Sequence, residues 1–139
     1  MTAASRGDAL DSGAVRFLRG ALAVFFVIAG ANHFFSPGPY LAIMPPSLPW
    51  PAALIYISGA AEIAGGVGVL LPETRRLAAL GLIALLVAVF PANIYGAVHG
   101  MQIGSRAVSA WILWLRLPLQ GILIAWVYFA GWKTPKASR

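Results

Sequence analysis

The sequence predicts an all-α membrane protein, an antiparallel four-helix transmembrane bundle with both termini in the cytoplasm (N-in/C-in). Of the 139 residues, 60% are hydrophobic and only 10% are charged, whereas soluble domains carry about 25% charged residues. The apolar residues gather in four runs of about 20 residues, the length of helix that crosses a bilayer core. These runs use most of the chain, so we expect one membrane domain and no separate soluble domain.

The domain boundaries follow from where the apolar runs begin and end. We expect a disordered cytoplasmic tail over residues 1–13, a membrane domain over 14–133 and a second cytoplasmic tail over 134–139. Within the membrane domain, the expected spans are about 15–35, 52–71, 77–98 and 108–131.

The connections between the spans have the composition of surface segments. The first connection is uncharged, with prolines at 37, 39, 45, 46 and 49 and the aromatic residues Tyr40 and Trp50, as is typical of a segment on the outer membrane surface. The second is the short charged turn 72–76, of the length expected between antiparallel helices. The third contains Arg106 and His99, which we expect to be solvated.

Lysine and arginine residues predict the orientation. Eight fall on the side of both termini: Arg6, Arg16, Arg19, Arg75, Arg76, Lys133, Lys136 and Arg139. Only Arg106 falls on the other side. Because cytoplasmic segments carry the excess of basic residues, we expect both termini in the cytoplasm, with the helices in a bacterial inner membrane.

Composition also excludes several classes of function. The formal net charge is +6, but the basic residues lie at the ends of apolar runs and not in a patch with interleaved aromatics, so nucleic acid is not an expected partner. The chain has no cysteine, which excludes disulfides and thiolate metal sites. Two separated histidines and one carboxylate inside a span do not form a metal-ligand set, so no metal is expected. No catalytic residue can be assigned.

Six strongly polar residues lie inside the apolar spans: Asn32, His33, Glu62, Asn93, Arg116 and Gln120. Such side chains cost a few kcal/mol each in a bilayer, so each needs a partner or a function. A rise of about 1.5 Å per helical residue places Glu62 near the midplane and the six together in a zone between the outer interface and the midplane. The sequence therefore predicts a polar pocket open toward the outer leaflet.

Structural and ligand-binding roles are both open for these residues, and they are not exclusive. Glu62 and Arg116 can form a buried ion pair that fixes helix register, or bind a ligand. Asn93 and Gln120 are expected to form hydrogen bonds between helices. His33 is either an interfacial residue near the lipid headgroups or a ligand-binding residue.

Glu62 also lies on a stripe of small residues in the second span. Ser58 precedes it by one turn, and Gly65 and Gly66 follow it by one turn. Small residues at such spacing allow a neighbouring helix to approach closely. We therefore expect this face of the second span to pack against another helix.

Four short motifs occur in order along the chain: Gly30-Ala31-Asn32-His33-Phe34, Gly59-Ala60-Ala61-Glu62, Arg75-Arg76-Leu77-Ala78 and Arg116-Leu117-Pro118-Leu119-Gln120. With this order and spacing, the chain resembles the DoxX-like family of small four-helix membrane proteins from Arg16 to Tyr128. Some relatives in that family are subunits of a thiosulfate:quinone oxidoreductase, and others associate with thiol or oxidative-stress enzymes. The resemblance implies the four-helix fold and redox-enzyme subunits as partners. A chain without cysteine performs no thiol chemistry of its own.

We expect the pocket to bind a small, partly apolar molecule such as a quinone. Arg116 or His33 would donate to its oxygen, and Glu62 would orient Arg116. The protein would then be an accessory subunit of membrane redox metabolism. One alternative is a non-catalytic assembly or chaperone-like protein whose Glu-Arg pair is structural, and another is a small-solute or proton pathway through Glu62. The lipid bilayer is a partner in every case, and a homo-oligomer stays open.

Overall fold

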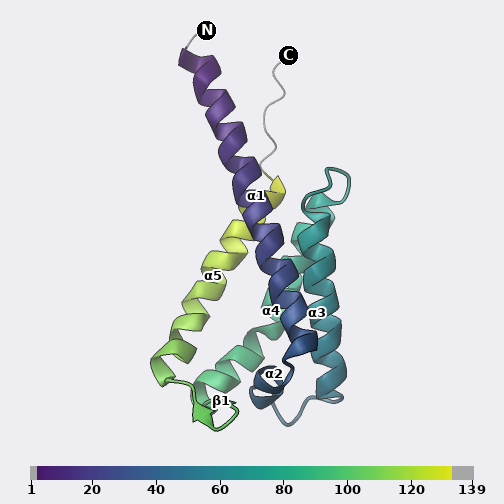
Figure 1. Ribbon diagram of the computed structural model, residues 1–139, viewed down its shortest axis with the longest axis vertical. Coiled ribbons are helices and arrows are strands. Elements are labelled where there is room, and N and C mark those ends of the chain that lie inside the picture. Colours follow the sequence, from purple (N-terminus) through teal and green to yellow (C-terminus); the bar gives the residue numbers. More distant parts are fainter. Residues whose placement is uncertain (1–2, 133–139) are drawn as a thin grey trace.

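The computed structural model describes residues 3–132, which form helices and one short hairpin (Figure 1). The helices are α1 (Ala3–Phe35), α2 (Gly38–Ala42), α3 (Pro51–Gly68), α4 (Arg75–His99) and α5 (Ala110–Trp132). Between α4 and α5, the strands β1 (Gln102–Ile103) and β2 (Arg106–Ala107) pair in antiparallel fashion.

The prediction of an all-α protein with four membrane-length helices is confirmed within the described residues. The stretches that are long and apolar enough to cross a membrane are Gly13–Phe35, Pro51–Gly68, Arg75–His99 and Ala110–Trp132. Among these stretches, the largest difference from the predicted spans is at the end of α3, expected at Leu71 and found at Gly68. Elsewhere the boundaries follow the apolar runs, because the cost of burying backbone polar groups in lipid forces each run into a helix.

The α3–α4 turn explains the early end of α3. Thr74 Oγ1 donates to the carbonyl of Gly68 at 2.9 Å, and Arg75 Nε donates to the carbonyl of Val69 at 3.0 Å. These two side chains satisfy carbonyl groups that the end of a helix leaves without partners. The charged turn therefore has a structural role in addition to its expected effect on orientation.

Toward the N-terminus, α1 is longer than the membrane span predicted for it. It begins at Ala3, so the backbone of residues 3–13, expected as a disordered tail, continues the helix. No proline interrupts this segment, and its alanines favour helix. The expected tail over 134–139 lies outside the described residues.

Each long helix packs mainly against the next long helix in the sequence: α1 against α3, α3 against α4, and α4 against α5. In addition, α1 contacts α5. Glycines set the closest approaches. A Cβ atom on Gly30 would lie 2.5 Å from the carbonyl oxygen of Gly59, and one on Gly66 would lie 3.0 Å from the carbonyl oxygen of Ala23. The expected close packing of the small residues of α3 is thereby confirmed, with Gly66 against α1 and Gly65 against Leu82 of α4.

The fully buried core lies toward the end of the molecule that holds the α3–α4 turn. Its largest enclosed side chains are Phe26, Leu22, Leu82, Val69 and Val127. Many large apolar side chains point outward instead, as in Phe35, Leu77 and Trp111. An outward apolar surface is what a lipid solvent favours and water does not.

Arg19 joins α1 to α5 beside this core. Its side chain is only 4% exposed, and Nε donates to the carbonyl of Ala130 at 2.9 Å. From the sequence, Arg19 is expected only to contribute to orientation. The structure adds a structural role, because a buried guanidinium needs such acceptors.

The opposite end is covered by two elements that the sequence analysis does not predict. Figure 1 shows α2 and the β1–β2 hairpin together at the end away from the α3–α4 turn. After α2, Ile43 packs closely against Gly96 of α4. A Cβ atom added to Gly96 would collide with the side chain of Ile43. These elements cover the side of the helices where the polar residues gather.

Candidate functional site

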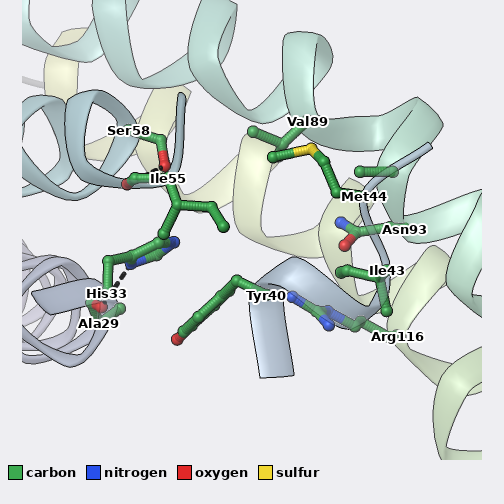
Figure 2. A pocket seen from close by; sticks show the side chains of 11 residues that line it. Ala29, His33, Tyr40, Ile43, Met44, Ile55, Ser58, Val89, Asn93 and Arg116 are labelled. Atoms are coloured by element: carbon green, nitrogen blue, oxygen red, sulfur yellow. Dashed lines mark hydrogen bonds between the residues drawn. The ribbon is translucent and has the colours of Figure 1, made fainter. Parts of the chain in front are cut away.

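A cavity of about 140 Å³ lies beneath α2, where the helices meet (Figure 2). Its polar lining consists of His33 from α1, Tyr40 from α2, Ser58 from α3, Asn93 from α4 and Arg116 from α5. Its apolar lining consists of Ala29, Ile43, Met44, Ile55, Val89 and Ala92. All five of the described helices thus contribute to one partly polar space, which we call the pocket.

Behind the α1 wall of the pocket, Glu62 faces His33. Oε2 of Glu62 lies 3.5 Å from Nδ1 of His33, and the two side chains are 13% and 10% exposed. No residue that the structure describes forms a hydrogen bond with this carboxylate oxygen. His33 is therefore the nearest charge partner available to the carboxylate, at a distance longer than a good hydrogen bond.

The ring of His33 is fixed on two sides. Nδ1 lies 2.9 Å from the carbonyl oxygen of Ala29, one turn earlier in α1. The ring also stacks on Tyr40, with 3.9 Å between ring centres. From the sequence, His33 could face either the lipid headgroups or a ligand. The structure places it in the wall of the pocket.

Tyr40 is held in turn by Asn32. Nδ2 of Asn32 donates to the hydroxyl oxygen of Tyr40 at 2.9 Å. Asn32 is exposed and does not line the pocket, so it supports Tyr40 from outside. From the sequence, Tyr40 is expected only to be an aromatic residue at the membrane interface. The one signal for Tyr40 in the sequence is its position, because it follows the polar Asn32-His33 pair closely in the chain and lies between prolines.

On the opposite wall, Asn93 and Gln120 form hydrogen bonds between helices, as expected, and they do so with each other. Nδ2 of Asn93 donates to Oε1 of Gln120 at 2.7 Å, and Nε2 of Gln120 donates to the carbonyl of Leu86. This chain fixes the orientation of the Asn93 amide. Its Oδ1 atom accepts no hydrogen bond from the described residues and remains an acceptor at the pocket wall.

Arg116 differs from the other polar residues. It is half-buried at the pocket wall and forms neither a hydrogen bond nor an ion pair with any residue between 3 and 132. The expected contact with Glu62 is therefore wrong as a direct pair, because the Glu62 side chain is directed to His33. The two opposite charges interact only at longer range.

The six sequence-predicted residues divide into two layers. His33, Asn93 and Arg116 line the pocket. Each of the other three lies behind a lining residue: Glu62 behind His33, Asn32 behind Tyr40 and Gln120 behind Asn93. In the part of the chain that the structure describes, no group of His, Asp or Glu side chains could hold a metal ion.

Together, the fold and the pocket define a helical integral membrane protein with a polar cavity between its spans. The chain belongs to the family described as Domain of unknown function (DUF8561), which matches residues 22–130. That range contains every residue of the pocket. No curated protein and no solved structure matches the chain.

Proposed function

We propose that this protein binds a small amphipathic molecule with an oxygen-bearing ring, such as a quinone, in the pocket. The observation that carries the proposal is the side chain of Arg116. A guanidinium has five N–H donors and no acceptor, and its charge is costly inside a membrane span unless it is paired. Arg116 donates to no described residue, so an oxygen of a ligand in the pocket is a suitable acceptor.

The dimensions of the pocket agree with a single ring. Its volume is about 140 Å³, and a protein cavity of about 150 Å³ is known to accept benzene. In this proposal Ile43, Met44 and Ile55 of the pocket walls contact the faces of the ligand ring. Arg116 and Asn93 lie at the edge of the ring that carries oxygen. An apolar tail longer than the pocket would extend into the surrounding lipid.

The membrane arrangement is part of the same proposal. The helices form an antiparallel bundle whose termini and α3–α4 turn face the cytoplasm of a bacterial cell. The distribution of charge supports it, since Arg16, Arg19, Arg75 and Arg76 lie near one end and Arg106 lies in the hairpin at the other. The pocket then opens toward the outer leaflet.

The biological setting that we propose is an accessory subunit of membrane redox metabolism. The resemblance to DoxX-like proteins supports this setting, with redox-enzyme subunits as partners and a homo-oligomer as a further possibility for assembly. The protein would hold or present the ligand to such a partner, and no catalytic step is assigned to this chain.

A second candidate is a structural role in assembly, with no ligand. The observation that favours it is the second layer of the site, since the Glu62–His33 and Asn93–Gln120 pairs both join different helices. In this case Arg116 would extend toward water at the outer surface. The two candidates predict different effects of removing Arg116. The first predicts loss of the bound ligand, and the second predicts lower stability with no ligand lost.

Mass spectrometry of apolar extracts from purified protein tests the proposal. The samples are the natural sequence, Arg116→Gln and the matched control Arg106→Gln, which removes the same charge from the exposed hairpin. We expect a ring compound enriched in the natural protein and in the control but lost in Arg116→Gln, compared at equal folded fraction. Equal extracts from all three, with lower thermal stability for Arg116→Gln, would favour the structural candidate.

A further inference from the structure

The tautomer of His33 follows from its contact with Ala29. A carbonyl oxygen only accepts hydrogen bonds, so the 2.9 Å contact requires Nδ1 of His33 to carry the proton. In a neutral imidazole the other nitrogen, Nε2, is then an acceptor. Figure 2 shows this second nitrogen directed away from Ala29, on the cavity side of the ring.

Nε2 is free to accept a hydrogen bond from the pocket. No residue that the structure describes donates to it, and it is not enclosed by protein as Glu62 Oε2 is. The nearby hydroxyl of Ser58 donates to the carbonyl of Ile55 at 2.8 Å and so is already used. Nε2 is therefore an unused acceptor at the pocket wall, and a hydroxyl group of a ligand in the pocket can donate to it.

Glu62 strengthens this arrangement from behind. Its carboxylate oxygen lies 3.5 Å from Nδ1, on the ring edge that carries the proton. A carboxylate at that edge fixes the tautomer and makes the opposite nitrogen a better acceptor. The stack on Tyr40 keeps the ring from rotating.

We infer that His33 and Glu62 make the pocket selective for ligands that carry a ring hydroxyl, that is, phenols or hydroquinones, over the fully oxidised quinone. This inference rests on the proposed function. A hydroxyl can donate to Nε2 of His33 while an oxygen elsewhere on the ring accepts from Arg116. The carbonyl oxygen of a quinone would instead place lone pairs against lone pairs at Nε2.

The chain contains a matched control for His33. Nδ1 of His99 lies 3.0 Å from the carbonyl oxygen of Tyr95, also one turn earlier, and its ring stacks on Tyr95 with 4.0 Å between centres. His99 is exposed, does not line the pocket and has no carboxylate within ion-pair distance among the described residues. It reproduces the local geometry without the proposed function.

The test measures dissociation constants for three probes in detergent micelles under argon: decyl-benzoquinone, decyl-hydroquinone and the dimethyl ether of the latter. We expect the natural protein to bind the hydroquinone about tenfold tighter than the other two, the effect of one hydrogen bond to an otherwise unpaired acceptor. His33→Phe should keep the stack on Tyr40 and reduce this preference to less than about twofold, whereas His99→Phe should retain it.

Glu62→Gln provides a second test should His33→Phe fail to fold, and we expect it to reduce the preference without changing quinone affinity. Equal binding of quinone and hydroquinone to the natural protein would overturn the inference and leave the pocket proposal intact. Binding of none of the three probes to folded protein would overturn both. Arg116→Gln should weaken all three probes alike.

Discussion

Nδ1 of His33 lies 3.5 Å from Oε2 of Glu62, although His33 is near the C-terminal end of α1 and Glu62 is well inside α3. The contact exists because the two helix backbones touch at Gly30 and Gly59, where neither residue has a side chain to separate them. Close approach brings the carboxylate to the Nδ1 edge of the imidazole ring. The site therefore depends on two glycines that are not part of its chemistry.

Gly59→Ala should disturb this approach. The added Cβ would lie 2.7 Å from Cβ of His33 and 2.8 Å from the carbonyl oxygen of Gly30, so the helices must move apart. We expect the free energy of unfolding in micelles to fall by about 1–3 kcal/mol, the usual cost of overpacking. Gly121→Ala is the control, because a Cβ there meets nothing within 4 Å. Equal stability of both variants would contradict the packing described.

The Asn93–Gln120 hydrogen bond should appear as coupling in a double-mutant cycle. Asn93→Ala, Gln120→Ala and the double variant are compared with the natural protein by denaturant unfolding. We expect a favourable coupling of about 0.6 kcal/mol and not more than about 1.7 kcal/mol, as for other hydrogen bonds within membranes. Gln120→Ala should be the more costly single change, because it also removes the donor to Leu86. Strictly additive effects would show that the bond contributes nothing.

Membrane orientation can be tested with single cysteines, since the natural chain has none. Ser105 lies at the exposed turn of the hairpin and Glu73 in the exposed α3–α4 turn. We expect Ser105→Cys to react with a membrane-impermeant maleimide added to intact cells. Glu73→Cys should react only after the inner membrane is permeabilised. The reverse pattern would show that the termini face outward.

The four long helices could be predicted from the sequence because lipid leaves an apolar run only one stable backbone form. The polar zone could be predicted for a similar reason, since side chains such as Arg116 and Gln120 are rare inside spans and are easily recognised. A role for Asn93 and Gln120 in hydrogen bonding between helices followed from the same argument, but their pairing with each other did not. These predictions need only hydrophobicity and helical rise.

The partners within the site could not be predicted in the same way. Helical rise gives the depth of Glu62 but not the helix that it faces. The close backbone contact at Gly30 brings the Glu62 side chain to His33 and not to Arg116. Tyr40 could not be assigned because α2 is only five residues long and has no periodicity that would place it over the pocket. Tertiary packing determines both features.

The most direct test of the central claim uses photo-methionine, which the cell incorporates in place of methionine. Of the methionines, Met44 lines the pocket, whereas Met101 lies before the hairpin and does not. After illumination of labelled cells, we expect the Met44 peptide to carry the mass of a ring-containing amphipathic molecule that is absent from the Met101 peptide, and Arg116→Gln to abolish it. The same phospholipid adducts on both peptides, unchanged by Arg116→Gln, would contradict a ligand in the pocket.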